Sequence, residues 1–137
     1  MKGTALKRIL YVEDDDPIRA VGVLALRAVG GFEVVACASG AEAVAAAPAA
    51  GADLILLDVM MPTMDGPGTL ERLRQLPATA HTPVVFLTAL VQPAEVARLL
   101  AMGAVGVLSK PFNPMTLPAR LRELWTKAAS KANTPGT

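Results

Sequence analysis

Four polar stretches carry the residues best suited to chemistry, and each stands at the end of a short apolar run. They are the acidic run Glu13–Asp16, the carboxylate Asp58, the hydroxyl of Thr88 and the pair Ser109-Lys110. Carboxylates gathered at one place repel one another unless a cation lies among them. Hard oxygen ligands with room for water suit Mg²⁺ or Mn²⁺. The acidic residues therefore predict a divalent metal site.

Asp58 is the candidate nucleophile, because it emerges from the apolar run Leu54–Leu57 beside the predicted metal. A carboxylate in that position can attack phosphorus and give an aspartyl phosphate. The transferring oxygens then need neutralisation, which the metal and Lys110 would supply, with Thr88 as a hydroxyl donor. Taken singly, each of these residues is ordinarily a cap, a strand end or a surface charge. Their coincidence at four strand ends favours one shared site.

Strands and helices alternate along the chain and would position these groups. Apolar runs too short for helices predict strands at Arg8–Val12, Phe32–Cys37, Asp53–Leu57, Pro83–Leu87 and Ala104–Leu108. Helical spacing follows each run. The first helix is predicted from near Pro17 to before Gly30, with Val21, Leu24, Ala25 and Ala28 on one face, and the second from the cap Ser39 through Ala41–Ala47 to Pro48. The other three are predicted from near Pro67, with Leu70, Leu73 and Leu76; over Pro93–Met102, with Val96, Leu99 and Leu100 inward; and from around Asn113, with Leu117, Leu121 and Leu124. Pro118 predicts that the last helix either starts at Leu117–Pro118 or kinks there.

This (βα)5 pattern predicts an α/β fold, a doubly wound five-stranded parallel sheet with right-handed crossovers and helices on both faces. Ligands of such sheets bind outside the carboxyl ends of the strands. The four polar stretches end four of the predicted strands, so we expect them to meet at that edge.

Composition excludes several classes of function. The 137 residues are 53% hydrophobic, and 13 Lys+Arg against 12 Asp+Glu leave a net charge of +1, which does not favour direct nucleic-acid binding. Every apolar run is too short to cross a membrane, and the N-terminus lacks a secretory signal, so we expect a cytoplasmic protein. The lone Cys37 is expected to be a buried apolar side chain. We expect one domain over residues 1–129 and a flexible tail over 130–137.

Four segments resemble the receiver domain of two-component response regulators. They are Ile9–Asp15 (ILYVEDD), Asp53–Gly66 (DLILLDVMMPTMDG), Val84–Ala89 (VVFLTA) and Lys110–Phe112 (KPF), in the family's order and spacing. The resemblance covers Lys7 to about Lys127 and implies a flavodoxin-like sheet of order 2-1-3-4-5. It also implies a single-domain signalling protein, with no room for an output domain in these residues, that acts on no external substrate.

The resemblance implies a role for each candidate residue. Asp58 would accept a phosphoryl group from a histidine kinase or a phosphotransfer protein, and the signal would pass to an unidentified downstream protein. Glu13, Asp14, Asp58 and the backbone carbonyl of Met60 would hold Mg²⁺. Thr88 and Lys110 would contact the phosphoryl oxygens, and a cis peptide before Pro111 would aim Lys110 into the site.

The chain departs from the family at the switch. In the family, a threonine moves toward the phosphoryl group and an aromatic side chain on strand five turns inward behind it. Val107, three residues before Lys110, occupies that aromatic position and has no ring to turn. We expect the signal to pass instead through the loop after Thr88 and the helix that follows, or the domain to serve as a phosphate shuttle or sink.

Three alternatives fit the residues less well. Haloacid-dehalogenase-like phosphatases also use an aspartyl nucleophile, but on their first strand and with a second Asp two residues later, where this chain has Met60. A flavodoxin-like cofactor binder would need an uncharged Ser/Thr/Gly-rich phosphate loop. A degenerate receiver that only docks partners is disfavoured by the intact set Asp14, Asp58, Thr88 and Lys110.

Overall fold

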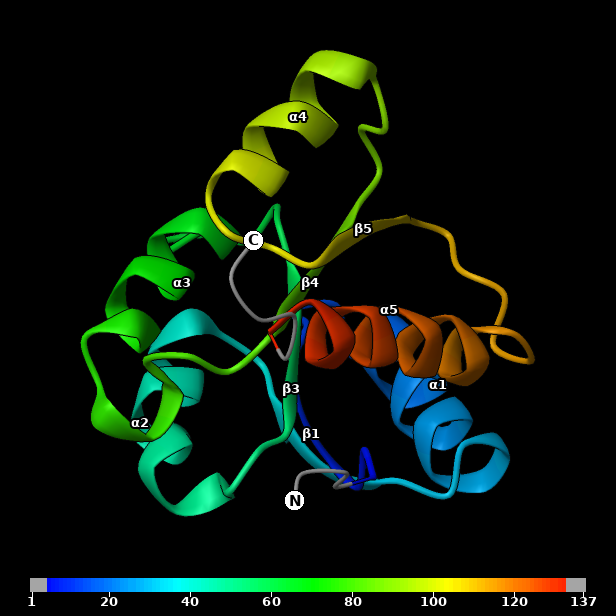
Figure 1. The fold of residues 1–137 in the computed structure, drawn as a ribbon. Coiled ribbons are helices and arrows are strands. Elements are labelled where there is room, and N and C mark those ends of the chain that lie inside the picture. Colours follow the sequence, from blue (N-terminus) through cyan, green and yellow to red (C-terminus); the bar gives the residue numbers. More distant parts are fainter. Residues whose placement is uncertain (1–4, 133–137) are drawn as a thin grey trace.

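The computed structural model describes residues 5–132, which form a five-stranded parallel sheet (Figure 1). Its strands are β1 (Arg8–Val12), β2 (Glu33–Cys37), β3 (Leu54–Asp58), β4 (Val84–Thr88) and β5 (Gly106–Ser109). The strand order is β2-β1-β3-β4-β5, with Val12 opposite both Cys37 and Leu57. The predicted α/β class and strand order are confirmed.

Helices follow every strand. They are α1 (Asp16–Leu24), which continues as the π-helical turn η1 (Ala25–Val29); α2 (Gly40–Ala50); α3 (Gly66–Arg74), followed by the 3₁₀ turn η2 (Pro77–Thr79); α4 (Pro93–Ala101); and α5 (Leu117–Ala132). Helices α1 and α5 cover one face of the sheet, and α2, α3 and α4 cover the other (Figure 1). Among residues 5–132, no helix is long and apolar enough to span a membrane.

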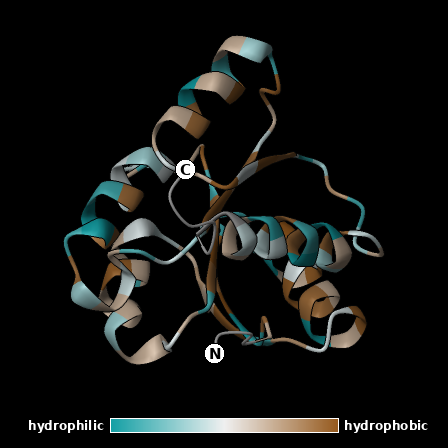
Figure 2. Ribbon diagram, in the orientation of Figure 1, coloured by the Kyte–Doolittle hydropathy of each residue, from teal (hydrophilic) through white to brown (hydrophobic). Residues whose placement is uncertain are grey.

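The core lies in two layers, one on each face of the sheet. On the α1 and α5 side, Leu26, Leu117 and Leu121 pack against alternate residues of the strands. On the other side, Ala43, Leu73 and Leu99 do the same. Figure 2 shows the strands coloured mainly as hydrophobic between the helices. Strands buried on both faces need nearly continuous apolar sequence, which explains why the short apolar runs located them.

Capping side chains start three of the helices. Asp15 accepts a hydrogen bond from the Ile18 N–H (2.9 Å) at the start of α1. Ser39 accepts one from Glu42 at the start of α2, and Asp65 accepts one from Gly68 at the start of α3. Such caps pair N–H groups that the first helical turn leaves free. They fix where the chain turns from strand to helix near the carboxyl edge of the sheet.

The predicted inward faces of two helices are partly wrong. Val21 and Leu24 of α1 are exposed, at 45% and 66%, and Ala28 is exposed as well. Ala25 is buried as predicted, but the inward face is made of Gly22, Ala25 and Leu26, at ordinary helical spacing, and Gly22 lies so close to the Tyr11 ring that a Cβ there would collide with it. In α4, Leu99 is buried but the next residue, Leu100, is 44% exposed, since consecutive residues point about 100° apart around a helix.

Several element boundaries also differ from the prediction. Helix α2 runs through Pro48 to Ala50 and ends at Gly51, which adopts a left-handed conformation (φ 61°). Helix α5 begins at Leu117, so Pro118 lies in its first turn, where a missing N–H costs nothing; the first of the two alternatives is confirmed. The same helix continues to Ala132, so 130–132 are helical where a tail was predicted, and 133–137 lie outside the described residues.

Strand ends shift by one or two residues in four of the five strands. β3 and β4 include Asp58 and Thr88 as their last residues, one residue beyond the apolar runs Asp53–Leu57 and Pro83–Leu87 that predicted these strands. The fifth strand is Gly106–Ser109 in place of the predicted Ala104–Leu108. Backbone pairing therefore holds two of the candidate functional residues directly.

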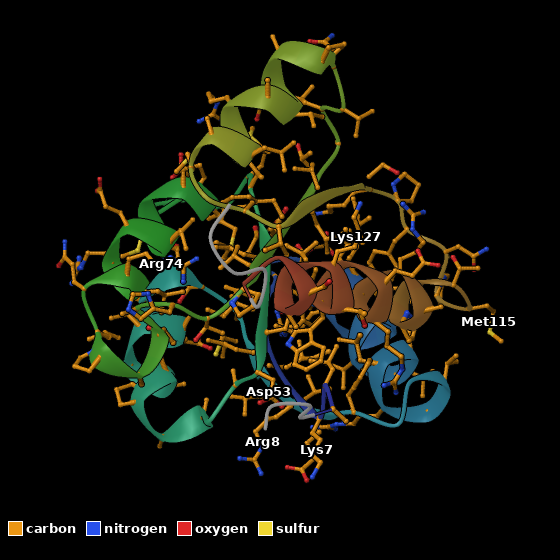
Figure 3. The ribbon with its side chains drawn as sticks, viewed as in Figure 1. Lys7, Arg8, Asp53, Arg74, Met115 and Lys127 are labelled. Carbon is orange, nitrogen blue, oxygen red and sulfur yellow. The ribbon has the colours of Figure 1, made fainter. Side chains whose placement is uncertain are left out.

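At the amino edge of the sheet, opposite the carboxyl edge, Asp53 links two neighbouring strands. Its Oδ2 accepts hydrogen bonds from the backbone N–H groups of Lys7 and Arg8, both 3.0 Å, so the starts of β1 and β3 are tied together. These three residues lie together at the lower edge of the molecule in Figure 3. Asp53 thus has a structural role away from the carboxyl edge.

Burial is expected to protect the Cys37 thiol from reagents. Cys37 is 3% exposed, and burial, assisted by nearby Glu42, raises its pKa to about 11. Because the thiolate is the reactive form, the folded protein should react with Ellman's reagent at pH 8 at least about a hundredfold more slowly than the protein in urea. Equal rates with and without urea would contradict this.

Candidate functional site

The carboxyl edge of the sheet brings together side chains from four strands. Glu13 directly follows β1, Asp58 ends β3, Thr88 ends β4, and Lys110 directly follows β5. Glu13, Asp58 and Thr88 are at most 1% exposed, and the Lys110 side chain is 17% exposed. The predicted convergence at this edge is what the structure shows.

Lys110 lies between two buried carboxylates. Its Nζ donates to Glu13 Oε1 (3.0 Å) and to Asp58 Oδ1 (3.1 Å). Its backbone N–H donates to the Thr88 carbonyl (2.9 Å), and the Lys110-Pro111 peptide is cis, as predicted. Burial lowers the pKa of Lys110, but its hydrogen bonds to Glu13 and Asp58 outweigh burial, so the net shift is upward. The ammonium group is therefore charged at neutral pH.

The surroundings of Asp58 disfavour its ionised form. Burial, followed by the charge of Glu13, raises the pKa of Asp58 to about 7, although Lys110 partly opposes the shift. Its second oxygen, Oδ2, is buried and receives no hydrogen bond from residues 5–132. A buried carboxylate oxygen without a donor is costly, which makes it a place where a cation or an incoming electrophile would be stabilised.

The donor set fits a small divalent cation. Glu13, Asp14 and Asp58 each offer one carboxylate oxygen, and these oxygens all lie within 4.8 Å of one another. Oxygens that share one Mg²⁺ at about 2.1 Å must lie roughly 3 to 4 Å apart, so little adjustment is needed. The free Asp58 Oδ2 supplies an unpaired ligand atom. The Met60 carbonyl, two residues after Asp58 in the loop before α3, stays a predicted ligand.

Among the described residues, no hydrogen bond joins the Thr88 side chain to the carboxylates. Its Oγ1 accepts a hydrogen bond from the backbone N–H of Leu90 (3.0 Å), in the loop between β4 and α4. A hydroxyl that accepts one bond still has its own proton to donate. Thr88 therefore links the edge of the site to the start of the β4–α4 loop.

Two residues that support the site were not singled out from the sequence. A Cβ on Gly66 would lie 2.5 Å from the carbonyl oxygen of Asp58, so only glycine lets α3 start this close to β3. Arg19 donates from Nη1 to the Glu13 carbonyl (2.9 Å). Gly66 is the last residue of the family motif Asp53–Gly66, which was a signal for it, but an arginine in the first helix gave no signal of its own.

The chain matches a known protein family. A family model described as the response regulator receiver domain matches residues 9–122. The chain belongs to this family. The receiver domain is 39% identical to the probable transcriptional regulator ycf27 of Cyanophora paradoxa over 118 residues, 86% of this chain and 48% of that protein. It is 36% identical to the DNA-binding response regulator MtrA of Mycolicibacterium smegmatis over 119 residues, 87% of this chain and 50% of that protein.

The chain thus spans about half the length of these relatives. Among solved structures, the receiver domain resembles the chemotaxis protein CheY4 of Vibrio cholerae, with a TM-score of 0.80 and 37% identity, covering 88% of this chain and 99% of that one. A CheY-like receiver domain protein of Methanospirillum hungatei gives a TM-score of 0.79 at 28% identity, covering 94% and 100%. Receiver domains are signalling modules of two-component systems, so the predicted family is confirmed.

At the predicted switch position, the receiver domain has a groove. Val107 is half-buried and forms part of a cleft of about 500 Å³ between β5, the β4–α4 loop and the start of α5. Val91, Val96 and Phe112 supply apolar walls, and Thr116 and Arg120 of the α5 region supply polar ones. A valine fills little of this space, so the groove is already open in this structure.

Proposed function

We propose that the receiver domain is a phosphoacceptor, in which Asp58 takes a phosphoryl group from a histidine kinase or a phosphotransfer protein. The observation that carries this proposal is Asp58 itself, 1% exposed, with one oxygen on Lys110 and the other without a donor from residues 5–132. Membership of the receiver family supports the same role.

Each residue of the site has a separate role in the phosphoryl transfer. One carboxylate oxygen of Asp58 attacks phosphorus, the nitrogen–phosphorus bond of the donor histidine breaks, and its imidazole nitrogen regains a proton from solvent. Lys110 stays beside Asp58 and stabilises negative charge on the phosphoryl oxygens, and Thr88 donates its hydroxyl proton to one of them. Mg²⁺ bound by Glu13, Asp14, Asp58 and the Met60 carbonyl would neutralise further charge on those oxygens.

A phosphotransfer partner needs a surface next to Asp58, and one lies beside Lys110. A cleft of about 460 Å³ is lined almost entirely by apolar residues of α1 and the segment after β5, among them Pro17, Ile18, Val21 and Phe112. Exposed apolar area bordered by polar residues is typical of protein-binding sites. The receiver domain would then act only on itself and signal by changing which protein it binds.

The test is intact-mass analysis after incubation with acetyl phosphate and Mg²⁺. Wild type should gain one phosphoryl group, and Asp58→Asn should gain none. Glu71→Gln is the matched control, because this carboxylate is exposed on α3, outside the candidate site, and its loss should leave the adduct in place. An adduct on Asp58→Asn, or none on wild type with any small-molecule donor, would refute the proposal.

The signal is expected to leave through the β4–α4 loop. If Thr88 turns toward a phosphoryl group, its bond to the Leu90 N–H is lost and the loop is released. Beryllium fluoride with Mg²⁺, which imitates the phosphoryl group, should therefore shift the amide NMR signals of Ala89–Gln92 far more than those of Val105–Leu108. Large and equal shifts in both segments would contradict a route that bypasses Val107.

A further inference from the structure

The loop that carries two of the three carboxylates of the candidate Mg²⁺ site is held by an arginine from the helix after it. Glu13 lies one residue beyond β1, so its backbone groups need partners outside the β1 ladder. Its N–H donates to the Cys37 carbonyl at the end of β2 (3.0 Å), and its carbonyl accepts from Arg19 Nη1 (2.9 Å).

The guanidinium of Arg19 joins the two ends of this loop. Its second nitrogen, Nη2, donates to Asp16 Oδ1 (2.6 Å), and Asp16 is the first residue of α1. The Arg19 side chain is only 22% exposed. A planar fork with two fixed donors can hold both partners at once, which the single ammonium of a lysine does less well.

The same loop fixes the carboxylate of Glu13. One oxygen accepts from Lys110 Nζ (3.0 Å) and the other from the Asp15 backbone N–H (3.1 Å). Both contacts require the backbone of Glu13–Asp15 to stay in place, and Arg19 is the side chain that ties Glu13 to α1.

We infer that Arg19 is a positioning residue for the Mg²⁺ site: it holds the Glu13–Asp16 loop so that Glu13 and Asp14 lie where the cation needs them. This inference rests on the proposed metal site. Groups that orient metal ligands commonly change affinity by tenfold or more when they are removed.

The positive charge of Arg19 has the opposite effect on Mg²⁺ affinity and weakens binding, because a nearby cation repels Mg²⁺. Loss of the guanidinium alone would therefore tighten binding at low ionic strength. In about 0.5 M KCl the screening length falls to roughly 4 Å, which suppresses this contribution and leaves the effect of position. Arg19→Lys separates the two effects further, since it keeps the charge and loses the fork.

The experiment measures Mg²⁺ affinity by calorimetry in about 0.5 M KCl, without a phosphoryl donor. Arg19→Gln should raise the Kd roughly tenfold and Arg19→Lys roughly threefold. Arg27→Gln is the matched control: this guanidinium follows α1 in η1 and also donates to a backbone carbonyl, that of Val34 (3.1 Å), so its loss should change the Kd less than about twofold.

Hydrogen exchange of the metal-free protein gives a second readout. Arg19→Gln should speed exchange of the Asp14 and Asp15 amides about fivefold or more, and Arg27→Gln should not. Unchanged Mg²⁺ affinity and unchanged exchange in Arg19→Gln, with wild type binding normally, would overturn the inference alone. Failure of wild type to bind Mg²⁺ would overturn the proposed metal site and this inference together.

Discussion

Replacing Lys110 with methionine is expected to lower the free energy of unfolding of the metal-free protein by about 3 kcal/mol at pH 8. Lys110 Nζ is the hydrogen-bond partner of both Glu13 Oε1 and Asp58 Oδ1, and both carboxylates are buried. Removing one member of a buried ion pair commonly costs about 3 to 5 kcal/mol. Asp58 can relieve part of the cost by taking up a proton, since its pKa is already about 7, so we expect the lower end of that range.

Urea denaturation of single and double variants measures this effect. Asp58→Asn removes one of the two carboxylates, so Lys110→Met should cost clearly less in that background. Lys127→Met is the control, because this exposed lysine lies on the outer side of α5 (Figure 3), and its loss should change stability by less than about 0.5 kcal/mol. Equal losses from Lys110→Met with and without Asp58 would show that the ammonium does not compensate the charge of Asp58.

The sequence predicted the sheet and its carboxyl edge well for a physical reason. A strand buried on both faces must be apolar along its whole length, so a polar residue at its end stands out, as Asp58 and Thr88 do. Parallel strands place those ends at one edge, and the site follows from the topology. The same rule places Lys110 and Glu13 within reach of Asp58, because each of them directly follows a strand that ends at this edge.

The predictions that failed depended on interactions with no local pattern. Val21 and Leu24 point outward because Gly22, Ala25 and Leu26 form the inward face, and a glycine packed against Tyr11 gives no apolar signal in the sequence. The hydrogen bond from Arg19 to a backbone carbonyl leaves no trace in residue type, because any exposed arginine has the same chemistry. Helix α2 continues past Pro48 and ends at the left-handed Gly51, so Pro48 is not the stop that the sequence predicted.

Asp58→Asn is expected to stabilise the metal-free protein by about 2 kcal/mol at pH 8. The pKa of Asp58 is about 7 in the folded state against about 3.9 for an unfolded aspartate, so the folded state binds the proton more tightly. Stability of wild type therefore falls as pH rises from about 4 to about 7 and then levels off. Asparagine has no proton to lose, and Lys110 keeps Glu13 as its partner at 3.0 Å. The advantage of the variant should thus be small at pH 4 and full above pH 7.

Mg²⁺ should reverse this order, which ties the stability of the site to its proposed function. A cation that binds only the folded state stabilises wild type by RT ln(1 + [Mg²⁺]/Kd), whereas Asp58→Asn has lost one ligand, binds more weakly and gains less. Thermal unfolding at pH 8 with and without Mg²⁺ tests this, with Glu123→Gln as a control that removes an exposed carboxylate from α5. If wild type were the more stable protein at pH 8 without Mg²⁺, the charge of Asp58 would be satisfied by the protein alone. The site would then have no need of a cation.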